Sequence, residues 1–152
     1  MNEQAETRSQ ELFHSGFHCA ESVLMSIAES RHIQSDLIPR IATGFCSGMA
    51  RTGGQCGAVS GAIMAINLFK GRQSPTESVE GSYALVRELI KQFAERFGST
   101  NCRMLLGCDL DTPEGQQTFR ANQLIERCYD YAVGATRIAM SLLEERTSRD
   151  MS

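Results

Sequence analysis

The stretch RTGGQCGAVSGAIMAINLF, residues 51–69, decides the fold because it is a helix-length segment with no charged residue after Arg51. Apolar residues occupy most sides of it, so we expect a helix over residues 56–70 that ends at the following glycine. Its length is near the lower limit for a membrane span, but it opens with Gly-Gly-Gln and contains Ser60 and Asn67. The sequence therefore favours a buried core helix.

Three small residues repeat along one face of this helix. Gly57, Gly61 and Ala65 stand at i, i+4 and i+8, so they form a flat ridge that another backbone can approach closely. Such a ridge can bring a cysteine of a second helix near Cys56, and it is equally typical of ordinary close helix packing. It can also serve a homodimer, so a homodimer stays an alternative.

The rest of the chain has helical periodicity nearly throughout. The expected segments are residues 3–13, a helix from Cys19, residues 37–43 capped by Asp36, a glycine-rich connection over 43–55, a helix from the SPTE capping box of residues 74–77 to Gly98, a turn at 101–106, a start at Thr112 and a long last helix from Leu124. No alternating run is long enough for a sheet. We therefore expect an all-α fold, a compact single-domain bundle of four to six helices over residues 1–152 with a frayed tail at 146–152.

Charge and composition narrow the class of protein. The formal net charge is -3 and the arginines are scattered, which argues against a nucleic-acid footprint. The polar and acidic start, MNEQAETRSQELF, lacks the basic tip and apolar run of a secretory signal. We expect a cytoplasmic protein that neither binds nucleic acid nor inserts into a membrane.

Six cysteines are the chemically informative residues. They are Cys19, Cys46, Cys56, Cys102, Cys108 and Cys128. Their spacings contain no C-x-x-C and no C-x-x-C-H, so a compact zinc ribbon, a thioredoxin-type motif and covalent c-type haem are absent as local patterns. In a reducing compartment such cysteines are ligands, catalytic groups or small buried side chains.

Four of these cysteines stand at informative positions. We expect Cys19 and Cys56 at helix N-termini and Cys102 in a first turn, where free N–H groups and the helix dipole favour a thiolate. Arg51 can assist thiolate formation at Cys56. Cys128 is expected in mid-helix on an apolar stripe, where desolvation raises a thiol pKa. These positions leave a four-thiol site and a set of unrelated core cysteines about equally supported.

The sequence around these cysteines is similar to that of a known family. The matching stretches are HCAESVL around Cys19, ATGFCSGMARTGGQCGAVSGAI around Cys56, GSTNCRMLLGCDLDTPEG around Cys102, and Cys128 itself. The chain resembles the small bacterial and archaeal family described as "putative redox-active protein" and labelled C_GCAxxG_C_C. The resemblance covers most of the chain and implies that these four cysteines carry the family's chemistry, whereas Cys46 and Cys108 are incidental. It implies redox activity and names no substrate.

Three functions stay open for Cys19, Cys56, Cys102 and Cys128. In the first, Cys19 or Cys56 attacks and another thiol resolves a disulfide exchange with an unidentified redox partner, so that the protein, if it is an enzyme, is an oxidoreductase. In the second, the four thiolates hold a zinc ion or an iron–sulfur cluster for electron transfer or sensing. In the third, the protein is a non-catalytic interaction protein with buried thiols.

Other polar residues add little to these hypotheses. His14 and His18 are spaced at i, i+4, but a helix is expected to end between them at Ser15, so a His-pair metal site is not expected. Asp109 and Asp111 are interpreted as loop or cap residues before the helix that starts at Thr112. No acid/base pair is predicted from them.

Overall fold

A computed structural model of the chain describes the backbone of residues 2–151 and the side chains of residues 2–145. Within these residues the predicted all-α architecture is confirmed, since the backbone forms helices and an isolated β-bridge but no strand. The elements are α1 (Asn2–His14), α2 (Cys19–Ser30), the 3₁₀ helix η1 (Arg40–Phe45), α3 (Cys46–Arg51), α4 (Gly57–Lys70), α5 (Glu80–Phe97), α6 (Cys102–Leu106), α7 (Pro113–Ala121) and α8 (Ile125–Met151). The side chains of the tail predicted to fray, residues 146–152, lie outside the described residues.

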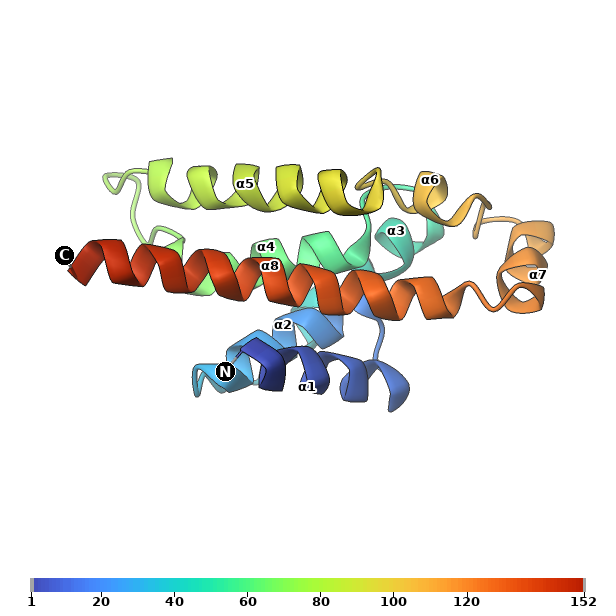
Figure 1. Cartoon of the computed structure of the whole chain (residues 1–152), viewed down its shortest axis with the longest axis horizontal. Coiled ribbons are helices and arrows are strands. Elements are labelled where there is room, and N and C mark those ends of the chain that lie inside the picture. The colour runs from blue at the N-terminus through green and yellow to red at the C-terminus, as the bar shows by residue number, and fades with distance from the viewer. Residues whose placement is uncertain (1, 152) are drawn as a thin grey trace.

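Five long helices, α1, α2, α4, α5 and α8, form the body of the molecule (Figure 1). The helix α8 contacts the other four, and α2 also packs against α1 and α4. Their facing side chains form a hydrophobic cluster in which Val23, Ile27, Ile66, Leu89 and Phe93 are fully buried. The short helices α3, α6 and α7 gather at the end of the bundle away from the C-terminus (Figure 1).

The predicted small-residue ridge of α4 is where α2 lies. A Cβ added at Gly61 would stand 2.5 Å from the carbonyl oxygen of Ala20 and 2.9 Å from its Cα. Because these are backbone atoms of a packed helix, a side chain at position 61 would push α2 away from α4. The ridge therefore sets the spacing of the two helices, and it places the start of α2 beside the start of α4.

The predicted helix over residues 37–43 is wrong in its start and its type, because a 3₁₀ helix that begins at Arg40 takes its place. The hydroxyl of Ser35 accepts a hydrogen bond from the Leu37 amide at 3.1 Å, so residues 36–39 form turns in place of a first helical turn capped by Asp36. The 3₁₀ helix η1 follows, with Pro39 as its N-cap. Short polar side chains that bond to nearby amides compete with helix formation in this way.

The predicted helix start at Ser74 is also wrong. The carboxylate of Glu77 accepts a hydrogen bond from the Gln73 amide at 2.8 Å, and the hydroxyl of Ser74 pairs with that of Thr76. These bonds close a separate turn, and α5 begins only at Glu80. The predicted end of this helix at a glycine is confirmed, because Gly98 caps α5 with a left-handed φ of 94°.

The glycine-rich connection contains an element that the sequence did not predict. In α3, Ser47, Gly48, Met49 and Ala50 have φ between 56° and 64°, and Arg51 follows with φ 71°. These values belong to a left-handed helical turn. L-residues adopt this conformation at a cost of about 1–2 kcal/mol each, so the surrounding packing must impose it.

None of the helices in the described part of the chain combines the length and the hydropathy that a membrane crossing requires.

Candidate functional site

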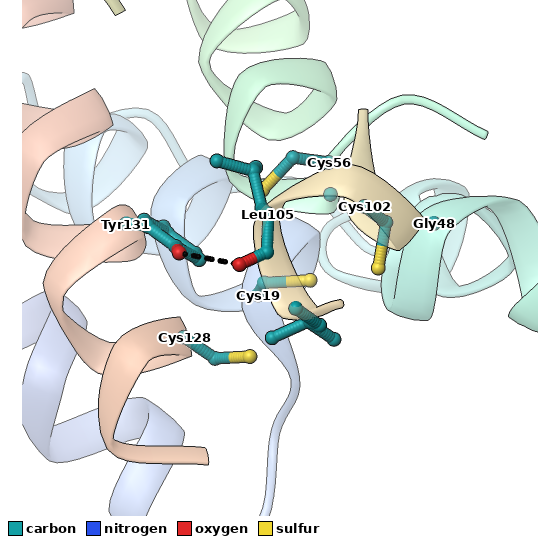
Figure 2. Close-up of a pocket in the computed structure, with 9 residues that line it drawn as sticks. Cys19, Gly48, Cys56, Cys102, Leu105, Cys128 and Tyr131 are labelled. Carbon is teal, nitrogen blue, oxygen red and sulfur yellow. Dashed lines mark hydrogen bonds between the residues drawn. The ribbon is translucent and has the colours of Figure 1, made fainter. Parts of the chain in front are cut away.

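The four cysteines of the predicted site line one buried pocket at the short-helix end of the bundle (Figure 2). Cys19 is the first residue of α2, Cys56 is the N-cap of α4, Cys102 is the first residue of α6, and Cys128 is the fourth residue of α8. The cavity between them has a volume of about 20 Å³, room for roughly one water molecule. Four separate elements thus bring the thiols to one place, while their chemical role stays a prediction.

Two glycines form walls of this pocket. A Cβ at Gly57 would collide with the sulfur of Cys19 and stand 2.9 Å from the carbonyl oxygen of Phe45. A Cβ at Gly48, in the left-handed turn, would collide with the Cβ of Cys102 and stand 2.9 Å from its sulfur. Both positions require glycine because the cysteines lie directly against the backbone.

Backbone hydrogen bonds hold two of the cysteines in place. The isolated β-bridge pairs Gln55 with Asn101, the residues that precede Cys56 and Cys102. The Cys56 amide donates to the Thr100 carbonyl at 2.7 Å, and the Cys102 amide donates to the Gly54 carbonyl at 2.8 Å. The main-chain positions of both cysteines are therefore fixed relative to each other.

The loop that carries Cys102 is tied to α8 by side-chain hydrogen bonds. The hydroxyl of Tyr131 donates to the Leu105 carbonyl at 3.2 Å (Figure 2). The guanidinium group of Arg127 donates to the same oxygen at 3.4 Å. Such carbonyls at the end of a short helix have no partner within the helix. Tyr131 also lines the pocket, so it couples the position of α6 to the helix that carries Cys128.

The expectation that a helix N-terminus makes Cys56 a thiolate is wrong. Burial raises the pKa of Cys56 from its ordinary value of 9.0 to about 12. The backbone N–H groups of Ala58 and Val59 do lower it, as the sequence predicted, but the loss of hydration outweighs them, and the nearby sulfurs of Cys102 and Cys128 raise it further. Cys56 is therefore a protonated thiol in this conformation.

Burial also raises the pKa values of Cys102 and Cys128. It raises the pKa of Cys102 to about 11, with Cys108 as a second cause. It raises the pKa of Cys128 to about 12, and Cys102 and Cys108 add to the increase. The sequence predicted this direction from a mid-helix position, but that position is wrong, because Cys128 is only the fourth residue of α8 and is buried by the packing around the pocket. The pocket as described therefore favours neutral thiols.

Cys46, interpreted as incidental, lies beside a pocket cysteine. A Cβ at Gly57 would touch the Cys19 sulfur and stand 3.2 Å from the Cα of Cys46. The pKa of Cys46 is raised, chiefly by its hydrogen bond to Cys19 and then by burial. Its sulfur also lies 3.8 Å from a carboxylate oxygen of Glu21. Cys46 is thus a fifth thiol at the edge of the site, which no spacing rule indicates.

Cys108 does not line the pocket. It is half-buried, and its pKa is raised by burial and by the neighbouring Asp109. The backbone amide of Asp111 donates to the Asp109 carboxylate at 2.9 Å, so these two aspartates form a loop, as expected.

A second, larger cavity of about 260 Å³ lies outside the pocket. Cys19, Cys102, Leu106 and Cys128 line both spaces, whereas Cys56 lines only the inner one. Arg51 lines the outer cavity and not the inner pocket. The expected assistance of Cys56 by Arg51 therefore stays a prediction without a contact that supports it.

No group of three or more His, Cys, Asp or Glu side chains among the described residues stands in an arrangement that could hold a metal ion. The four pocket cysteines are nevertheless soft donors of the kind that zinc and iron–sulfur clusters take, once deprotonated.

The fold and the pocket define a class: a small helical protein whose separate helices enclose a cluster of thiols. The defining pattern of the family described as "Putative redox-active protein (C_GCAxxG_C_C)" matches residues 17–142, and the chain belongs to this family. An uncharacterized protein of Archaeoglobus fulgidus is 28% identical over 144 residues, which cover 89% of this chain and 95% of the relative. No solved structure matches the chain.

Proposed function

We propose that the protein is a thiol–disulfide oxidoreductase whose pocket cysteines cycle between a dithiol and a disulfide. The observation that carries this proposal is the placement of Cys19, Cys56, Cys102 and Cys128 around a cavity no larger than one water molecule. The family description supports redox chemistry, and the shared cavity supplies neighbours for a resolving step.

Cys19 is the attacking thiol in this proposal. It lines both the inner pocket and the outer cavity, so a substrate that enters from solvent can reach it. It is the first residue of the 12-residue helix α2. Cys56, the other candidate, lies deeper and is assigned no role in the attack.

The reaction is a two-step exchange with a substrate disulfide, R–S–S–R′. The Cys19 thiolate attacks one sulfur, forms a mixed disulfide with R–S and releases R′–S⁻, which takes a proton. A second pocket thiol then loses its proton, attacks Cys19 and releases R–S⁻, which is protonated in turn. The protein dithiol is oxidised by two electrons, and the substrate disulfide is reduced to two thiols.

The test starts from protein purified and reduced without oxygen. Reaction with the neutral reagent bis(2-hydroxyethyl) disulfide is expected to remove two thiols per chain, and peptide mapping is expected to place the new disulfide among the four pocket cysteines. Cys19→Ser should slow the loss of thiols at least tenfold, whereas the control Cys108→Ser, outside the pocket, should not.

Three results would overturn the proposal. The first is an equal rate of thiol loss in Cys19→Ser, and the second is oxidation confined to Cys46 and Cys108. The third is about one metal ion per chain, or visible absorption bands, with all four pocket thiols retained through the oxidation. That last result would establish the zinc or iron–sulfur alternative instead.

A further inference from the structure

The outer cavity is the entrance to the thiol pocket. Its floor is formed by three of the pocket cysteines, Cys19, Cys102 and Cys128. Its volume of about 260 Å³ is close to the lower end, about 300 Å³, of sites that bind small molecules. A molecule of a few heavy atoms that occupied it would therefore be in contact with the sulfur that the proposed reaction uses.

The ionisable nitrogen-bearing side chains that line this cavity are all basic, and no acidic side chain among its described lining residues balances them. Arg51 and Arg120 line it together with His18, and none of the described residues in its lining is acidic. Arg51 belongs to the left-handed turn α3 and Arg120 to α7, so two separate elements each bring a guanidinium group to the same space. Both groups carry a positive charge at any physiological pH.

These two guanidinium groups have no carboxylate partner among the described residues. Other arginines of the chain do: Arg8 pairs with Glu29, Arg103 with Asp109 and Arg137 with Glu6. Guanidinium groups recognise carboxylates in a planar, two-pronged geometry. The cavity thus presents two cations that are free to pair with a ligand.

The remaining walls are largely apolar. They are formed by Phe13, Leu106, Leu110, Phe119 and Ile125. Such walls accommodate the methylene groups and sulfur atoms of a small disulfide, while the charges at the rim fix its ends. The cavity therefore combines a cationic rim, an apolar wall and a thiol floor.

We propose that the outer cavity binds a small anionic disulfide, one whose short chains end in carboxylates, and delivers its S–S bond to Cys19. Arg51 and Arg120 pair with the carboxylates, and the sulfurs lie over the cysteine floor. This inference rests on the proposed thiol–disulfide exchange and names the class of substrate for it. The released products are then two thiols that each carry a carboxylate.

The experiment compares three disulfides of equal chain length that differ only in their end groups. 3,3′-Dithiodipropionate carries two carboxylates, bis(2-hydroxyethyl) disulfide is neutral, and cystamine carries two ammonium groups. The rate of protein thiol loss with each is divided by the rate at which the same reagent oxidises free dithiothreitol, a neutral dithiol, which removes the intrinsic reactivity. We expect the normalised rate to be about tenfold higher for the dianion than for the neutral reagent, and lowest for cystamine.

The variants test which residues carry this preference. The double variant Arg51→Gln/Arg120→Gln should reduce the preference for the dianion to near one, whereas Arg87→Gln, which removes one charge from the exposed face of α5, should retain it. Circular dichroism establishes that the double variant folds. In the unaltered protein the preference should also shrink as ionic strength rises, so the inference stays testable if the double variant does not fold.

The two proposals fail in different ways. Equal normalised rates for the three reagents, or a preference that survives the double variant, would refute the anionic site while two-electron oxidation of the pocket remained. If none of the three reagents oxidised the pocket cysteines, the thiol–disulfide function itself would be refuted.

Discussion

The walls of the thiol pocket are built from two adjacent segments that differ in handedness. The helix α4 is a regular right-handed helix of 14 residues, and its wall residue Gly57 follows the local preferences of the chain. The turn α3 is left-handed over Ser47–Arg51, and its wall residue Gly48 lies where the backbone is costly for other residues. Local helix propensity explains the conformation of the α4 wall. Only tertiary packing explains the conformation of the α3 wall.

The difference shows that the left-handed turn α3 carries the conformational strain of the pocket walls. The four non-glycine residues of the left-handed run, Ser47, Met49, Ala50 and Arg51, each cost about 1–2 kcal/mol. In return the turn places Gly48 against Cys102 and brings Arg51 to the outer cavity. Strain of this kind is found where a fold holds a functional group in a fixed position.

The largest expected effect comes from the strained wall. Gly48→Ala adds a methyl group against Cys102 and a side chain at φ 64°, so we expect a loss of about 2–5 kcal/mol in the free energy of unfolding. Gly57→Ala meets the Cys19 sulfur without the φ penalty and should cost less, about 1–3 kcal/mol. Urea unfolding measures both. The control Gly81→Ala, in the first turn of α5 with nothing within 4 Å, should lose no stability and gain up to about 1 kcal/mol. A larger loss for Gly57→Ala than for Gly48→Ala would reverse the comparison.

An intermediate effect concerns the thiols that the two walls enclose. Below pH 9 these thiols are protonated in the folded and the unfolded chain, so they add no pH dependence. Above pH 9 the unfolded chain loses protons that folded Cys102 keeps to about pH 11 and Cys56 to about pH 12. Stability must therefore fall as the pH rises, by about 1.4 kcal/mol per pH unit for each fully buried thiol.

Serine variants show how much of this pH dependence comes from Cys56, which precedes the wall residue Gly57, and how much comes from Cys102, which lies against the wall residue Gly48. Between pH 9 and 11, Cys56→Ser should remove about 2–3 kcal/mol of the decrease in the free energy of unfolding, and Cys102→Ser should remove less. Urea unfolding at several pH values provides the measurement. If both variants showed the decrease of the unaltered protein, the burial of these thiols would not control it.

The smallest expected effect tests the handedness directly. Ala50→Gly relieves a left-handed residue at φ 56° and should raise the free energy of unfolding by about 0.5–1 kcal/mol, after the entropy that glycine adds to the unfolded chain. Ala84→Gly, in the right-handed α5, should lower it by about 1 kcal/mol. Thermal or urea unfolding gives both values, and effects of the same sign would show that residue 50 is not left-handed in solution.

The same contrast explains how far the sequence could predict the structure. The helix α4 and its close approach to a second helix were predictable because the apolar run and the spacing of Gly57 and Gly61 are local patterns, but that the partner is α2 was not. The turn α3 was not, since Met49 and Ala50 favour right-handed helix and only long-range packing overrides them. Gly48 was the one local indication of a left-handed turn. In a segment with several glycines, however, it does not indicate which of them lies against a cysteine.

The candidate site was predictable in membership more than in chemistry. The resemblance supplied the four cysteines, and the helix-terminal position of Cys56 correctly predicted that backbone N–H groups lower its pKa. The depth of burial decides whether the pKa of Cys56 is raised or lowered overall. This depth depends on how the other helices pack, which no local sequence pattern indicates. The contact of Cys46 with Cys19 and the place of Arg120 over the thiols likewise depend on how distant segments dock.

The β-bridge between Gln55 and Asn101 has a consequence for the order in which the molecule is assembled. The two halves of this bridge are separated by α4 and α5, and Cys19 and Cys128 come from still more distant parts of the chain. A fragment of the chain can contain the complete pocket only if it extends from α2 into α8, because Cys19 and Cys128 stand at the two ends of this segment. The contacts that join Cys19, Cys56 and Cys102 all lie before α8 in the chain, so the pocket is completed in its last step, when α8 brings Cys128.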